Sequence, residues 1–144
     1  MAYVLIEEQK SSGKHVQLQP ASLTVLIFTI GDVRANARIF VQEILKQPKL
    51  THYKFALAYV ELMMMGQLLE IWTAATEKPS VYVQTSLEDF DHVWLMWGHE
   101  ISIMQKFWEK YKEKSWSGED ILVKEDLGIK EGLVGSKEMF SCID

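Results

Sequence analysis

The chain has 144 residues, of which 48% are hydrophobic and 24% are charged, and its formal net charge is −5 at pH 7. These values are typical of one globular domain and exclude a wholly disordered chain. The acidic balance argues against a surface built throughout for nucleic acid. Cys142 is the only cysteine, so no disulfide can form within the chain, and a single thiol is typical of a reducing compartment.

The start of the sequence has no basic leader, and Glu7 and Glu8 follow the first residues closely. No run is apolar over the roughly 20 residues that a bilayer-spanning helix needs. The most apolar run, 23–30, is followed by Asp32 and Arg34. We therefore expect a cytoplasmic protein.

The first predicted element is a small β unit. Strands are expected over about 2–9 and 14–19, because the Ser-Ser-Gly sequence between them is typical of a turn. The run 23–30, rich in Thr, Val and Ile, favours a third strand, although a helix that starts at Pro20 is the alternative. Alternation in the first two strands would turn four apolar side chains toward a core, namely Tyr3, Leu5, Val16 and Leu18.

Two helices are predicted next, over about 33–47 and 53–76. Asp32 can cap the first, and Pro48 disfavours helical geometry at the residue before it. The second is apolar nearly all round, as buried central helices are. Gly66 in its middle costs about 1 kcal/mol of helix propensity, so we expect another element to pass close to it.

The third predicted helix, over about 87–114, is the best defined. Ser86 can cap it, acidic residues begin it and lysines end it, which suits the helix dipole. Large apolar residues follow one another at steps of four and three, as the a and d positions of a heptad do. This set, which we term the aromatic seam, contains Phe90, Trp94, Trp97, Ile101, Met104, Trp108 and Tyr111.

The sequence thus predicts an α+β fold dominated by three helices, with a small N-terminal β element. Residues 1–114 would form one helical domain. The glycine-rich segment 115–144 would dock on that domain or on a neighbouring chain.

Few residues are candidates for chemistry. His92 and His99 share one helical stripe but lie about 10 Å apart along the axis, which is too far for both to bind one metal ion unaided. Glu61 and Glu70 interrupt the apolar second helix, where a carboxylate could act as a general acid or base. Structural roles are the favoured interpretation for all four. No nucleophile, phosphate-loop or zinc motif is present, so we expect no enzyme, cofactor or metal site.

The end of the third helix mixes aromatic residues with lysines. Such a surface could bind an anionic membrane or nucleic acid. Glu109 and Glu113 reduce its charge, and lysines that extend from a helix end explain it more simply. The residues of this candidate site are Lys106, Lys110, Lys112, Lys114 and Trp116.

The favoured prediction is a non-enzymatic interaction module that forms a homodimer or larger homo-oligomer, or binds a partner protein, through the third helix and the tail. Three helices offer too little area to cover so many large apolar residues, and aromatic side chains of this type dominate interface energies. The expected interface contains Trp94, Trp97, Ile101, Met104, Trp108 and Tyr111. Binding of membrane or nucleic acid through 106–116 is the first alternative. A small enzyme or ligand-binding domain that uses His92, His99, Glu61 or Glu70 is the second.

Overall fold

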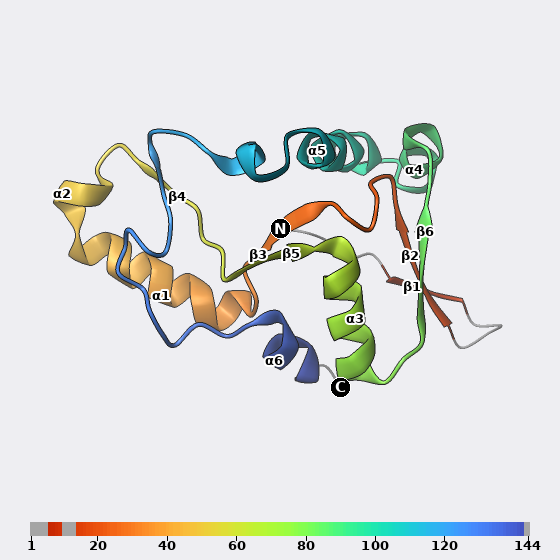
Figure 1. Ribbon diagram of the computed structural model, residues 1–144, viewed down its shortest axis with the longest axis horizontal. Helices are drawn as coiled ribbons and strands as arrows, with labels where there is room; N and C mark the ends of the chain where they lie inside the picture. Colours follow the sequence, from red (N-terminus) through yellow and green to blue (C-terminus); the bar gives the residue numbers. More distant parts are fainter. Residues whose placement is uncertain (1–5, 10–13, 143–144) are drawn as a thin grey trace. The chain divides into compact units, whose positions relative to one another are not determined.

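The computed structural model describes residues 6–9 and 14–142 (Figure 1). These residues form six α-helices, one 3-10 helix and three small sheets. The fold is therefore mixed α/β, and the prediction of three dominant helices with one small N-terminal β element is wrong. The error has two sources: strand pairing between distant segments replaces half of the second predicted helix, and a close helix contact divides the third.

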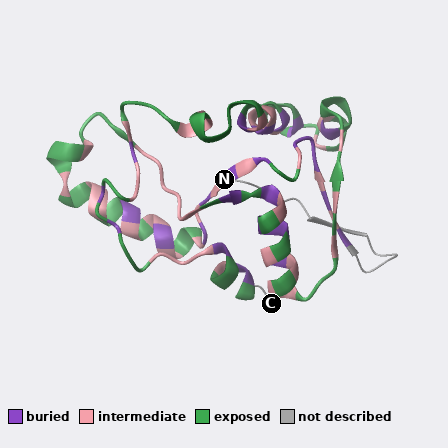
Figure 2. Cartoon of the chain, in the orientation of Figure 1, coloured by how far each residue is buried: buried purple, intermediate pink, exposed green. Residues whose placement is uncertain are grey.

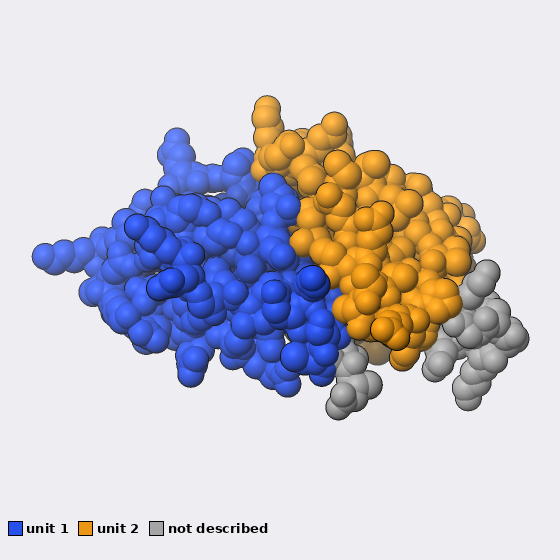
Figure 3. All heavy atoms as spheres, turned by 60° about the horizontal axis from the view of Figure 1, so that its bottom comes forward, with its two compact units in different colours: residues 1, 28–62, 116–144 blue, residues 2–27, 63–115 orange. Residues whose placement is uncertain are grey.

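The chain divides into two compact units, which Figure 3 colours separately. Within the described residues, unit 1 consists of 28–62 and 116–142, and unit 2 consists of 6–9, 14–27 and 63–115. The predicted division into 1–114 and 115–144 stays a prediction.

A three-stranded sheet belongs to unit 2. Strands β1 (Ile6–Gln9) and β2 (Lys14–Gln19) form an antiparallel pair, and β2 pairs in parallel with β6 (Ser80–Gln84). The register places His15 opposite Ser80 and Gln19 opposite Gln84. The strand predicted over 14–19 is present, and the one predicted over 2–9 is present from Ile6 onward, while residues 2–5 lie outside the described part of the chain.

The buried face of β2 is polar. Its buried side chains are His15, Gln17 and Gln19, whereas Val16 and Leu18 are half-buried. The prediction that Val16 and Leu18 face the core is therefore wrong. Successive side chains of a strand point to opposite faces, so a strand whose buried face is assigned wrongly has every side chain on the wrong side. Tyr3 and Leu5, predicted on the same face, lie outside the described residues.

Helix α3 (Met65–Thr76) occupies only the second half of the helix predicted over 53–76. The first half holds two short strands instead, β4 (Phe55–Ala56) and β5 (Glu61–Met64). The backbone N–H groups of Phe55 and Leu57 each donate to carbonyl oxygens of the segment 120–122 at 2.8 Å. Gly66 thus lies in the first turn of α3, where its N–H donates to the Leu23 carbonyl at 2.9 Å.

The helix predicted over 87–114 is divided into α4 (Leu87–Val93) and α5 (Gly98–Tyr111), followed by the 3-10 helix η1 (Lys112–Trp116). Gly98, the first residue of α5, permits the close approach that this break brings about. A Cβ atom there would lie 2.9 Å from Asp91 Cα and 3.0 Å from the Phe90 carbonyl oxygen. The two helices touch at this glycine, which they could not do as one straight rod, so the aromatic seam is not a continuous stripe.

Unit 1 is built around α1 (Val33–Lys46), close to the predicted range 33–47. The Asp32 side chain caps it by accepting from the Arg34 N–H at 2.9 Å. Strands β4 and β7 (Ile121–Leu122) pair in parallel within this unit. Strand β3 (Leu26–Thr29), which lies within the predicted run 23–30, pairs with β5, and the residues of both strands are divided between the two units. Two short helices complete the set, α2 (Pro48–Thr51) and α6 (Ser136–Ser141).

The core of unit 1 joins α1 to the C-terminal segment. Its buried members are Phe40, Leu122, Leu127 and Ile129. The apolar residues of 122–129 are therefore occupied by packing within unit 1, which decides what the tail can contribute to any binding surface.

Candidate functional site

Helix α5 buries polar residues and exposes large apolar groups; Figure 2 colours its buried and exposed positions. Its buried residues are Gly98, Ser102, Gln105 and Trp108, whereas Ile103, Phe107 and Tyr111 are 51%, 45% and 43% exposed. A helix at the surface of a globular protein ordinarily has the opposite arrangement. The inversion makes this helix the most informative surface of unit 2.

The polar side of α5 contacts the end of β2, while the other buried side chains of β2 contact α3. The Gln105 amide donates to Gln19 Oε1, and the Gln17 amide donates to Met65 Sδ at 3.5 Å. These three glutamines are at most 3% exposed. Further along the same stripe, Glu109 accepts from the Ser22 N–H at 3.1 Å. The inner face of α5 thus carries an amide and a carboxylate beside the buried Trp108 ring.

The turn that precedes α5 also exposes large apolar residues. Leu95 and Met96 are 88% and 82% exposed, and Trp97 is 60% exposed. On α5 the rings of Phe107 and Tyr111 lie 4.5 Å apart between centroids. We define the α5 outer surface as the exposed apolar residues of this stretch, namely Val93, Leu95, Met96, Trp97, Ile103, Phe107 and Tyr111. Large exposed apolar patches on soluble proteins commonly mark interaction sites.

Only part of the predicted interface lies on this surface. Trp97 and Tyr111 do, whereas Trp108 is buried and Trp94, Ile101 and Met104 are half-buried. Four exposed residues of this surface were not predicted, namely Leu95, Met96, Ile103 and Phe107. The available signal was the four-residue spacing of Ile103, Phe107 and Tyr111, which the heptad pattern of the seam obscured.

The lysines predicted to bind anions have different surroundings. Lys106 pairs with Glu109 at 2.7 Å, which lowers the pKa of the Glu109 carboxyl. Lys110 lies 5.4 Å from the centre of the Tyr111 ring, and Lys112 and Lys114 are exposed. The remaining member, Trp116, belongs to unit 1, where its ring lies 5.8 Å from that of Phe28.

His99 belongs to a polar cluster at the junction of α4 and α5. Its Nδ1 lies 2.8 Å from Asp91 Oδ2, and the Ser102 hydroxyl lies 2.9 Å from Asp91 Oδ1. The hydrogen bond from His99 holds the pKa of the Asp91 carboxyl below its usual value. Ser102 is only 1% exposed and its hydroxyl is directed at Asp91, so this cluster joins two helices rather than presenting a nucleophile. His92 is exposed, with Nδ1 2.7 Å from the Glu88 carbonyl oxygen.

Glu61 lies at the start of α6 in unit 1. Its Oε2 accepts from the Ser136 N–H at 2.8 Å and from the Ser136 hydroxyl at 2.6 Å, and Thr29 Oγ1 lies 3.3 Å away. Ser136 is fully buried. The carboxylate therefore serves as a cap for α6, supplied by a residue distant in sequence.

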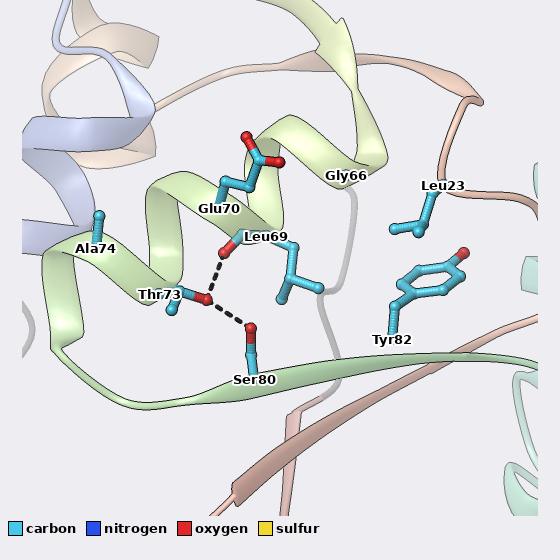
Figure 4. A pocket seen from close by; sticks show the side chains of 8 residues that line it. All are labelled: Leu23, Gly66, Leu69, Glu70, Thr73, Ala74, Ser80 and Tyr82. Atoms are coloured by element: carbon cyan, nitrogen blue, oxygen red, sulfur yellow. Dashed lines mark hydrogen bonds between the residues drawn. The ribbon is translucent and has the colours of Figure 1, made fainter.

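Glu70 lines a pocket of about 500 Å³ in unit 2, shown in Figure 4. The Leu23 side chain and the Tyr82 ring lie side by side there. Most polar groups of the wall bond to the protein itself: Thr73 donates to the Leu69 carbonyl and contacts Ser80, and the Tyr82 hydroxyl donates to the Ala21 carbonyl. Burial raises the pKa of Tyr82, so its phenol stays protonated. The pocket thus offers apolar contact but little directional chemistry.

Within 6–9 and 14–142, no three His, Cys, Asp or Glu side chains are grouped so that they could hold a metal ion. In the same part of the chain, no helix has the length and apolar composition needed to cross a bilayer. No protein-family model, no curated protein and no solved structure matches this chain.

Proposed function

We propose that the protein is a non-enzymatic interaction module that assembles with a second copy of itself through the α5 outer surface. The observation that carries the proposal is the inverted helix: α5 buries Ser102 and Gln105 while Ile103 and Phe107 face outward. Full burial of an apolar side chain of this size is worth about 1.5–3 kcal/mol. A second copy that covers the surface would bury these side chains and so supply this stabilisation, which a single copy lacks.

A second copy is the favoured partner because the charges along this part of the chain are ordered. On the exposed side of α5, the acidic Glu100 lies near the start of the helix and the basic Lys110 lies near its end. In a two-fold symmetric interface each surface meets its own copy, turned around. The acidic end of one copy then meets the basic end of the other, which favours association.

The C-terminal tail is not part of this proposal. Its apolar residues Leu122, Leu127 and Ile129 pack in the core of unit 1, so they are not available to cover another chain.

The test is the mass of the protein in solution at increasing concentration, measured by sedimentation. The wild-type chain should shift from monomer to dimer. Phe107→Gln should hold the monomer to concentrations at least tenfold higher, because it removes an apolar ring at the centre of the surface. Phe55→Gln is the matched control, since Phe55 is a 75% exposed phenylalanine of unit 1 and its loss should leave the dimer intact.

A wild-type chain that stays monomeric at millimolar concentration overturns the proposal. So does a Phe107→Gln variant that dimerises as well as wild type. Vesicles of anionic lipid provide the check on the first alternative: binding by a monomer, reduced by Phe107→Gln, would assign this surface to a membrane instead.

A further inference from the structure

The exposed positions of α5 form a palindrome. The exposed residues of this helix are His99, Glu100, Ile103, Phe107, Lys110 and Tyr111. Taken from the two ends inward they form pairs that are symmetric about position 105: 99 with 111, 100 with 110, and 103 with 107. Reversal of the helix therefore exchanges apolar with apolar at 103 and 107 and acidic with basic at 100 and 110, and it exchanges His99 with Tyr111.

We infer that two copies of α5 pair antiparallel with position 105 at the two-fold axis, so that Glu100 of each copy lies against Lys110 of the other. This inference rests on the proposed self-association. In the same register Ile103 lies against Phe107 of the second copy. A two-fold interface requires that if one residue contacts a second, the second contacts the first across the axis, and the palindrome meets this requirement at every exposed position of the helix.

The opposite orientation is disfavoured by the same residues. In a parallel, in-register pair each Glu100 would lie beside Glu100 and each Lys110 beside Lys110, and like charges at such positions repel. The two helix dipoles would also lie side by side in the same direction. Antiparallel pairing removes both costs.

The two charged residues are available for such pairing. Within the described residues, neither Glu100 nor Lys110 forms an ion pair, whereas Lys106 is already bound to Glu109. Glu100 and Lys110 are separated by about 15 Å along the axis at 1.5 Å per residue. Both pairs would therefore form at the ends of one short contact, with the apolar residues between them.

Charge reversal tests the register. Glu100→Lys and Lys110→Glu should each weaken the dimer by about tenfold at low salt, because each replaces two attractions by two repulsions. The double variant Glu100→Lys with Lys110→Glu should recover wild-type association within about threefold, since the charges are exchanged and the symmetry is kept. Added salt should reduce all these differences.

Matched controls are reversals off this face of unit 2, at the exposed residues Glu77 and Lys78. Glu77→Lys and Lys78→Glu should leave association unchanged, and circular dichroism should report a folded chain for every variant. If Phe107→Gln abolishes the dimer but the double reversal does not restore association, the antiparallel register is wrong while self-association stands. A wild-type monomer would overturn both.

Discussion

Replacement of Glu61 by alanine tests whether this carboxylate holds helix α6 in place. Its Oε2 is the acceptor for the backbone N–H and the hydroxyl of Ser136. Ser136 is fully buried and Thr29, the third neighbour, is 8% exposed. Alanine would leave the N–H at the start of α6 buried without an acceptor, although the Ser136 and Thr29 hydroxyls, 3.1 Å apart, could still bond to each other.

The expected loss follows from these contacts. A hydrogen bond to a charged acceptor contributes about 1.5–3 kcal/mol, and loss of a helix cap costs about 0.5–2 kcal/mol. The two descriptions overlap, so Glu61→Ala should reduce the free energy of unfolding by about 2–3 kcal/mol. At roughly 2–4 °C per kcal/mol for a chain of this size, the melting temperature should fall by about 5–10 °C. Glu61→Gln keeps an acceptor oxygen and should lose about half as much.

Urea and thermal unfolding followed by circular dichroism measure this loss, and hydrogen exchange at the Ser136 amide localises it to α6. Glu70→Ala is the control, because Glu70 is an exposed glutamate at the pocket of unit 2 and should change stability by less than about 0.5 kcal/mol. A Glu61→Ala chain that unfolds within about 0.5 kcal/mol of wild type would refute the capping role and return Glu61 to the candidates for chemistry.

Three further changes test other contacts. Asn36→Ala should cost about 2–4 kcal/mol in urea unfolding, because the buried Asn36 amide bonds the carbonyls of Ile30 and Val134 and the Val134 N–H; a loss under about 1 kcal/mol would contradict this. Gly31→Ala should lower the melting temperature strongly, because φ there is +59° and a Cβ would lie 2.0 Å from the Val134 oxygen; an unchanged melt would disprove the contact. The Asp91 carboxyl has a lowered pKa, so its stabilisation is present above the unfolded pKa near 4 and is lost as pH falls through the lower folded value. The melting temperature of Asp91→Asn should therefore fall less than that of wild type as the pH is lowered below about 4. An equal dependence of the two melting temperatures on pH would exclude this linkage.

Local signals in the sequence predicted the elements that depend on local interactions. Helix α1 begins after the Asp32 cap and ends before Pro48, as these two residues indicate. Strand β2 ends just before Pro20. In both places neighbouring residues decide the backbone conformation, and a single sequence contains that information.

Contacts between distant segments decided the rest. The apolar residues of the segment 53–64 have helical spacing, yet Phe55 and Leu57 pair with residues near 121. No residue close to them in the sequence indicates that partner. The division of the third predicted helix depends on how close Asp91 and Gly98 approach. Periodicity describes one element at a time, so it could not supply either contact.

The predicted interface and the α5 outer surface lie in the same segment but share only part of their residues. Trp97 and Tyr111 of the aromatic seam are exposed and Trp108 is buried, whereas the exposed Phe107 lies outside the seam. The rule that apolar residues face inward holds for Trp108 but fails for Ile103 and Phe107, because Gln105 of the inner face bonds to Gln19 of β2. Recognition of that face would have required knowing that β2 turns Gln19 inward.

The polar stripe also explains why α5 keeps its apolar residues outside. Ser102 bonds to Asp91, Gln105 to Gln19 and Glu109 to the Ser22 N–H, and these three residues follow one another at steps of three and four along one side of the helix. Burial of Phe107 would require α5 to rotate by nearly half a turn. This rotation would break all three contacts, and the amides of β2 would gain no new partners. Directional polar contacts can fix a unique arrangement at some cost in stability. The inner stripe therefore sets the rotation of the helix, and the outward position of Ile103 and Phe107, on which the proposed assembly depends, follows from it.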